Sequence, residues 1–149
     1  MVNYRNKSYC EHMDAQVHFR QLPDLTDERG PSFSIPANVM SELAVRDVHI
    51  AAIEPGHVRG NHYHEKKTEL ITVIYADEWT FYWDTGEETL VRRKEFTGRG
   101  AVSIEVPLLW SHAVKNDGKK GLWLINMTDQ PFDPSQPGST LDAVTRKIA

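Results

Sequence analysis

The fold is decided by residues 55–70, PGHVRGNHYHEKKTEL, where one residue separates His62 from His64 and Glu69 follows five residues later. On a β-strand successive side chains point to opposite faces, so the two histidines would share a face with Tyr63 between them. On a helix the two side chains would diverge. The pattern therefore predicts a strand that presents two imidazoles on one face.

The sequence on both sides of this stretch is typical of an all-β protein. Short runs rich in Val, Ile, Phe, Tyr and Trp recur, among them RDVHIAAIE, EWTFYWDT and GLWLINMT. Turn-forming pairs such as Pro55-Gly56 and Thr85-Gly86 separate these runs. Many short strands at close spacing indicate a sandwich or barrel. Only STLDAVTRKIA, residues 139–149, suggests a short C-terminal helix, with an extended tail as the alternative.

Composition narrows the classes of function. The 149 residues are 40% hydrophobic and 26% charged, which fits one domain with one core. The net charge is −4 and the cations are scattered, which argues against nucleic-acid binding and a polybasic membrane surface. Cys10 is the only cysteine, so a disulfide framework is excluded. The N-terminus lacks a signal-peptide pattern and no apolar run could span a membrane, so we expect a cytoplasmic protein.

A further histidine completes a candidate metal site. His112 follows a turn anchored by Pro107, and the polar residues EKKT can reset which face of the next strand is inward, so Glu69 can join the histidines. Three imidazoles and one carboxylate can hold a divalent zinc, nickel, iron or manganese ion with positions left open for water or substrate. The simpler alternative is an exposed pair of histidines, His62 and His64, on a polar strand.

The spacing of these residues resembles the two sequence motifs of the cupin superfamily. The matching positions are Gly56, His62, His64 and Glu69, then Gly100, Pro107, His112 and Asn116. The resemblance implies a single-domain cupin jelly-roll β-barrel, or double-stranded β-helix, with the four ligands inside. Ala76 and Leu109 stand where the motifs usually have glycine, which affects turns and not ligands. This fold hosts many unrelated activities.

The expected organisation is one domain over residues 1–149. It comprises N-terminal strands or an arm over 1–35, a metal-binding barrel core over 48–127 and a tail over 128–149. The arm is expected to pack across the barrel or onto a second subunit, because related cupins commonly form dimers. A homodimer is therefore predicted.

Three short segments resemble enzymes of sugar-nucleotide metabolism. VRGNHYH, residues 58–64, is similar to segments of capsular-polysaccharide enzymes that epimerise a UDP-linked 4-keto sugar and of dTDP-4-dehydrorhamnose 3,5-epimerases. TDERG, residues 26–30, resembles deoxysugar epimerases and nucleotide-sugar 3,4-ketoisomerases, and PFDPSQP, residues 131–137, resembles the capsular enzymes. The resemblance implies an epimerase or isomerase of a nucleotide-linked keto-deoxysugar. In the metal-free rhamnose-pathway enzymes the histidine matching His62 is a base and the position of His64 is not a ligand, so that mechanism does not transfer whole.

Candidate catalytic and substrate-binding residues follow from the chemistry. A proton next to a ketone can be removed only if the enolate is stabilised by a metal or a fixed cation. Arg59 is a candidate cation or diphosphate ligand, with Asn61 beside it, although a surface ion pair is the simpler role. His62 is a candidate base by resemblance, and Tyr75 and Tyr82 are candidate proton donors.

Two other functions remain open. The ligand set alone also fits a metal-dependent dioxygenase, and a barrel mouth lined with apolar groups would favour a non-catalytic small-molecule binding protein. Two further groups of residues have structural expectations. The aromatic side chains expected in the barrel core are Trp79, Phe81, Trp83, Trp110 and Trp123, while the histidines expected on the surface or on strands are His12, His18, His49 and His57.

Overall fold

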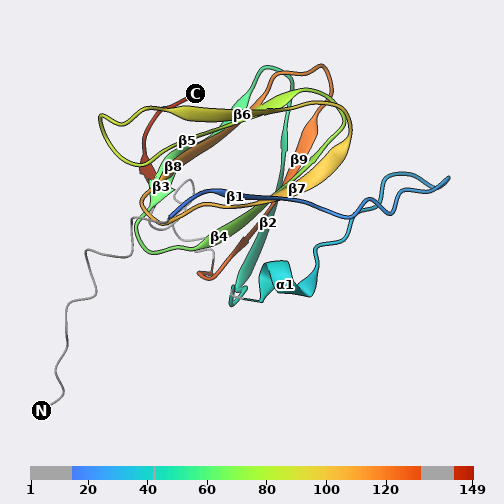
Figure 1. Ribbon diagram of the computed structural model, residues 1–149, viewed down its shortest axis with the longest axis horizontal. Helices are drawn as coiled ribbons and strands as arrows, with labels where there is room; N and C mark the ends of the chain where they lie inside the picture. Colours follow the sequence, from blue (N-terminus) through green and yellow to red (C-terminus); the bar gives the residue numbers. More distant parts are fainter. Residues whose placement is uncertain (1–14, 42, 132–142) are drawn as a thin grey trace, which may run out of the picture.

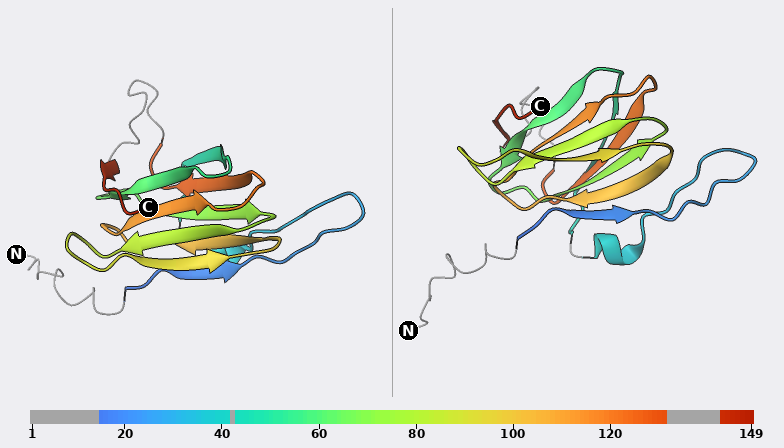
Figure 2. Two further views of the ribbon diagram at one scale, coloured as in Figure 1. Left: turned by 90° about the horizontal axis from the view of Figure 1, so that it is seen from above. Right: turned by 45° about the horizontal axis from the view of Figure 1, so that its top comes forward.

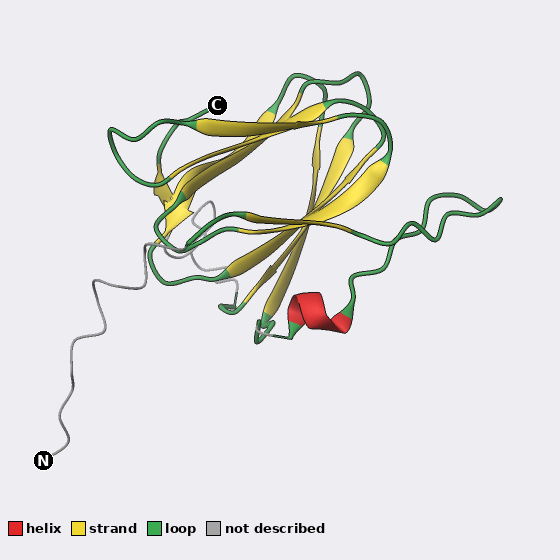
Figure 3. Ribbon diagram, in the orientation of Figure 1, coloured by secondary structure: helices red, strands yellow, loops and turns green. Residues whose placement is uncertain are grey.

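Two antiparallel five-stranded sheets form the walls of a jelly-roll barrel (Figures 1 and 3). The computed structural model describes residues 15–41, 43–131 and 143–149. The first sheet has the order β1 (His18–Gln21), β7 (Gly100–Glu105), β4 (Glu69–Tyr75), β9 (Leu122–Thr128), β2 (Asp47–Ile53). The second has the order β10 (Ala143–Thr145), β3 (Val58–His64), β8 (Ser111–Asn116), β5 (Trp79–Asp84), β6 (Arg92–Phe96). The all-β cupin prediction is confirmed.

The hydrophobic core fills the space between the sheets. Alternate residues of β4, Ile71, Val73 and Tyr75, face Trp79 and Phe81 of β5, and all five side chains are buried. Because strand side chains alternate, β4 also presents a second buried set to the outside of its sheet, where the Thr72 hydroxyl lies 2.9 Å from that of Ser103. Buried side chains therefore pack on both faces of this central strand.

One of the tryptophans predicted to lie in the core does not. Trp79 is buried, Trp83 and Trp110 are partly buried, and Trp123 is 54% exposed. The reason is the pleat of β9, which turns Leu122 and Leu124 inward and Trp123 outward. For Trp123 the prediction was wrong.

The predicted C-terminal helix was also wrong over the residues that the structure describes. Residues 143–145 form β10, which pairs antiparallel with the part of β3 that carries His62 and His64. An isolated helix this short is marginal in water, whereas the edge of β3 offers unpaired backbone groups. The extended alternative for this tail is therefore the observed one.

The N-terminal segment divides into two parts. Strand β1 pairs with β7 and closes one edge of the first sheet. Residues 22–35 then extend away from the barrel as a hairpin with bridges at Asp24–Phe33 and Asp27–Gly30 (Figure 2). Its packing onto a second subunit remains a prediction.

Two other features complete the description. The one helix in the described residues, α1 (Ala37–Met40), has four residues, so no helix in this part of the chain is long and apolar enough to cross a membrane. Cys10, His12 and most of PFDPSQP lie outside the described residues.

Candidate metal centre

The four predicted metal ligands come together between the two sheets. His62 and His64 come from β3, His112 from β8 and Glu69 from β4, and one ligand atom from each lies within 4.8 Å of the others. His64, Glu69 and His112 are only 4%, 6% and 4% exposed, whereas His62 is partly buried. The group therefore links both walls of the barrel.

A bulge in β3 sets the direction of the histidines. Gly60 pairs with Ala113 and His62 with His112, so Asn61 is an extra residue in the ladder. Gly60 has a φ of 93°, and a Cβ there would lie 2.6 Å from the His112 carbonyl oxygen. Only glycine fits this close approach without displacing β8. The bulge places both Arg59 and His62 on the inner face, opposite Val114 and His112.

Asn61 stabilises the bulge from the outside. Its φ of 59° is in the left-handed region, which asparagine adopts more readily than most residues. Its side-chain oxygen accepts hydrogen bonds from the backbone N–H groups of Ile148 and Ala149, at 2.9 and 3.0 Å. This oxygen of Asn61 therefore docks the C-terminal tail, and the contact of Asn61 with substrate stays a prediction.

A second turn beside the ligands contains Leu109, one of the two departures from the cupin motifs. Leu109 has a φ of 69°, a conformation that normally favours glycine. Its backbone N–H donates a 2.9 Å hydrogen bond to the carbonyl oxygen of His64. The turn thus keeps the geometry that the usual glycine would serve.

Glu69 lies at the centre of the ligand group. Its Oε1 atom is 2.6 Å from His112 Nε2 and 3.4 Å from His64 Nε2. Burial alone would raise the pKa of Glu69, but the attraction of His112 and His64 outweighs burial and holds that pKa well below its ordinary value. The carboxylate is therefore ionised and available as an oxygen ligand.

His62 is suited to coordination as a neutral ring. Burial, followed by the repulsion of His112, lowers the pKa of His62 to about 4, so this ring is neutral at pH 7. His64 Nδ1 and His112 Nδ1 are buried without a hydrogen-bond partner among the described residues, while Glu69 Oε1 contacts the Nε2 atoms of His112 and His64. Crowded buried polar atoms are costly, and a divalent cation could accept lone pairs from the carboxylate and the imidazoles together. The donor set therefore fits a divalent first-row metal.

Two small cavities adjoin the ligand group. One, of about 140 Å³, is lined by Arg59, His62 and His112, and the other, of about 100 Å³, by His62, His64 and Glu69. Both are also lined by His49 of β2 and Asn126 of β9. The group is therefore accessible to a small molecule from the side of the first sheet.

The sequence analysis missed His49 and Asn126 as site residues. His49 alternates with Ala51 and Ile53 along β2, and Asn126 alternates with Leu122 and Leu124 along β9. A polar residue at an inward position of such an alternating strand was the available signal.

Comparisons with known proteins agree with this architecture. The sequence matches the family described as Polysaccharide biosynthesis C-terminal domain over residues 26–140. The chain belongs to this family. A search of curated protein sequences gave no significant match.

Three solved structures share the fold of this family member. The capsular polysaccharide assembling protein CapF from Staphylococcus aureus has a TM-score of 0.59 at 20% identity, over 85% of this chain and 34% of CapF. QdtA, a sugar 3,4-ketoisomerase from Thermoanaerobacterium thermosaccharolyticum, has a TM-score of 0.60 at 15% identity, over 89% of both chains. The 3,5-epimerase RmlC from Legionella pneumophila has a TM-score of 0.60 at 17% identity, over 80% of this chain and 69% of RmlC. The chain thus has an RmlC-like cupin fold and spans about a third of CapF.

The two tyrosines predicted to act in catalysis lie away from the ligand group. Tyr75 is at the opposite end of β4 from Glu69, where its ring packs against Trp79 and Phe96. Tyr82 lines a depression with Thr80 and Lys115 on the outer face of the second sheet. Neither tyrosine lines the two cavities beside the candidate ligands.

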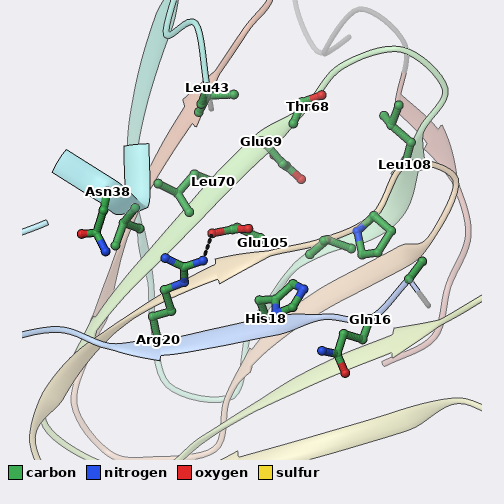
Figure 4. A pocket seen from close by; sticks show the side chains of 14 residues that line it. Gln16, His18, Arg20, Asn38, Leu43, Thr68, Glu69, Leu70, Glu105 and Leu108 are labelled. Atoms are coloured by element: carbon green, nitrogen blue, oxygen red, sulfur yellow. Dashed lines mark ion pairs between the residues drawn. The ribbon is translucent and has the colours of Figure 1, made fainter. Parts of the chain in front are cut away.

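A separate pocket of about 370 Å³ lies between β1, α1 and the ends of β4 and β7 (Figure 4). His18 and Arg20 project into it, and Arg20 forms an ion pair of 3.5 Å with Glu105. Glu69 borders this pocket, but the three histidine ligands do not line it. It therefore lies beside the candidate metal centre without being part of its cavity.

Proposed function

We propose that this protein is an epimerase or isomerase that moves a proton next to the ketone of a nucleotide-linked keto sugar. The observation that carries the proposal is the buried group of His62, His64, Glu69 and His112, which opens on a cavity with a guanidinium on its wall. Support also comes from the neighbours, since a QdtA variant was solved with TDP-4-keto-6-deoxyglucose and RmlC with dTDP-4-keto-L-rhamnose.

The cavity size favours entry of the sugar alone. Pockets that enclose drug-sized ligands measure about 300–1,000 Å³. The cavity beside Arg59 measures about 140 Å³, so it can take the sugar ring while the nucleotide remains outside. This arrangement places the reacting carbons near the ligand group and the diphosphate near the cavity mouth.

Arg59 is positioned to bind that diphosphate. Its Nε atom donates a 2.9 Å hydrogen bond to the Ala52 carbonyl oxygen across the gap to β2. No carboxylate in the described part of the chain forms an ion pair with Arg59, so the structure gives no support to a surface ion pair. With Nε held in place, the two terminal nitrogens can bind phosphate oxygens in the bidentate geometry that guanidinium favours.

We propose that the four ligands hold a divalent metal ion, which when bound would polarise the ketone and stabilise negative charge on its oxygen. The protein itself supplies the orientation. The bulge at Gly60 and Asn61 fixes the direction of His62, and the Leu109 turn fixes the end of β3 at His64. A site with its ligands fixed in advance does not need to reorganise as charge develops.

Solvent exchange tests this function directly. The protein would be incubated in deuterium oxide with dTDP- and UDP-linked 4-keto sugars, TDP-4-keto-6-deoxyglucose among them. We expect deuterium at a carbon next to the ketone and loss of exchange after chelation. Arg59→Lys should weaken nucleotide-sugar binding with unchanged metal content, because lysine keeps the charge but lacks the bidentate geometry. Absence of exchange with every sugar would contradict the proposal.

A metal-dependent dioxygenase is the second candidate. The observation that favours it is the ligand set itself, because three histidines and one carboxylate with open positions also suit iron in oxygen chemistry. The protein purified with iron, combined with substrate-dependent oxygen uptake and no deuterium exchange, would establish this alternative.

A further inference from the structure

The proposed reaction requires a proton carrier that is not a metal ligand. The lone pairs of His62, His64 and His112 and the carboxylate of Glu69 face one another within 4.8 Å. Tyr75 lies in the aromatic core, and Tyr82 on an outer face. The carrier must therefore come from another part of the cavity wall.

His49 occupies the required place. It lies on the inner face of β2, in alternation with the buried Ala51 and Ile53. It lines both cavities, and among the residues common to the two are His49, His62 and Asn126. His49 thus belongs to the first sheet and faces a space bounded on the other side by ligands from the second sheet. A substrate held between the two sheets would have the ligand group on one side and His49 on the other.

Asn126 provides a second, independent observation. It is the direct neighbour of His49 in the pairing of β2 with β9, and it also pairs with Ile71 of β4. Its Oδ1 atom is buried and has no hydrogen-bond partner among the described residues. A buried acceptor without a donor is costly in a folded protein, and a bound hydroxyl group would satisfy it.

We infer that His49 is the proton carrier of this site and that Asn126 binds a sugar hydroxyl beside the ketone. The inference rests on the proposed function. In the step, the C–H bond next to the ketone breaks, its proton passes to a ring nitrogen of His49, and the electron pair moves to the carbonyl oxygen to give an enolate. Return of a solvent-derived proton from His49 to carbon restores the ketone. No oxidant or further reactant is needed.

Asp47 and Lys67 are the other titratable groups on the wall of the second cavity that are not ligands. Neither lines the cavity that contains Arg59, whereas His49 does. A substrate that contacts both Arg59 and the ligand group would therefore meet His49 first.

The experiment compares His49→Gln, Asn126→Leu and the control His57→Gln. His57 is an exposed histidine in the turn before β3 and lines neither cavity. Each variant would be assayed for deuterium exchange with the keto sugar that the wild-type protein turns over. Its affinity for that sugar nucleotide would be measured by calorimetry, and its Co²⁺ binding by absorption spectroscopy.

We expect His49→Gln to slow exchange by about 100- to 10,000-fold, the usual contribution of a positioned acid or base. Its sugar-nucleotide affinity should stay within about threefold and its Co²⁺ spectrum should be unchanged, since glutamine keeps the polarity without carrying a proton. Asn126→Leu should weaken binding of the keto sugar by about tenfold or more, as expected for loss of a buried hydrogen bond. Affinity for the free nucleoside diphosphate should be unchanged in this variant.

Three results would overturn the inference. Exchange at the wild-type rate in His49→Gln would exclude His49 as the carrier while leaving the proposed function intact. Loss of Co²⁺ binding in that variant would assign His49 a structural role. Absence of exchange in the wild-type protein with every sugar tested would overturn the proposed function and, with it, the role of His49.

Discussion

The two ends of the barrel interior are built on the same strands and have opposite chemistry. At one end β4 contributes Tyr75, which packs with Trp79 and Phe96, and the last two rings stack with centroids 4.2 Å apart. At the other end β4 contributes Glu69, surrounded by three imidazoles. Five residues of β4, over a strand length of about 20 Å, separate an aromatic core from a group of buried polar atoms.

This contrast separates the residues that stabilise the fold from the residues of the candidate site. The aromatic end is stabilised mainly by the packing of apolar rings, so changes there should alter stability under all conditions. The polar end is incomplete without a ligand, so changes there should alter stability mainly when a metal or a proton is bound. Four predictions follow this division, in order of their expected effect on the free energy of unfolding.

The largest effect is expected at the aromatic end. Trp79 is fully buried and packs with Tyr75 and Phe96, and Trp79→Ala should lower the free energy of unfolding by about 3–5 kcal/mol, since it removes a large side chain and leaves a cavity. Urea denaturation should give the same loss with and without added metal. A loss that depends on metal would break the proposed separation of the two ends.

Acid should destabilise the metal-free protein through the polar end. Burial, followed by His112, lowers the pKa of His62 to about 4, whereas a histidine in an unfolded chain titrates near 6.5. The unfolded state therefore binds more protons between these values, and stability is lost as the pH falls through this window. Each pH unit within this window changes the free energy of unfolding by about 1.4 kcal/mol, so the whole window should lower it by about 3 kcal/mol.

The control for this prediction is His62→Asn, which removes the titrating ring. Denaturation of the chelated protein between pH 7 and 4 should be less pH-dependent in this variant, with His57→Asn behaving like wild type. If stability depended equally on pH in wild type, His62→Asn and His57→Asn, the loss of stability in acid could not be assigned to His62.

A smaller effect is expected from the bulge that orients the histidines. Gly56 and Gly60 both have a positive φ, but an added Cβ meets nothing within 4 Å at Gly56 and lies 2.6 Å from the His112 carbonyl at Gly60. Gly56→Ala should cost about 1 kcal/mol, and Gly60→Ala about 2–3 kcal/mol together with weaker metal binding. Equal costs measured by thermal denaturation would show that the close approach of β3 and β8 is unimportant.

The same contrast explains how much could be predicted from the sequence. The sequence predicted the group of candidate ligands that the structure brings together, because two histidines with strand spacing, a following glutamate and His112 form a local pattern that is characteristic of the fold. His49 and Asn126 were missed because the space they face is created by the pairing of β2 with β9, distant in sequence. Their place in the alternation of each strand was nevertheless a usable signal.

Differences between prediction and structure have the same long-range origin. Tyr75, a candidate proton donor, points inward as its place in the alternation predicts, but it lies at the opposite end of β4 from Glu69, because alternation predicts the face of a side chain and not its position along the barrel. The C-terminal residues 143–145 look helical in isolation, yet pairing with β3 makes them a strand. The docking of the tail on Asn61 could not be read from either segment alone.

The central claim is that the polar end is completed by a divalent metal, and His64 tests it most directly. His64 is 4% exposed and its Nε2 atom lies 3.4 Å from Glu69 Oε1, so His64→Ala should destabilise the metal-free protein, and the test is the further change that a metal adds. The decisive measurement is the unfolding midpoint and bound metal of wild type, His64→Ala and His57→Ala, each with a chelator and with Zn²⁺. We predict that Zn²⁺ raises the midpoint of wild type and His57→Ala and leaves His64→Ala unchanged, with one bound ion lost. Full metal content in His64→Ala, or no stabilisation of the wild-type protein by any divalent first-row ion, would contradict the account.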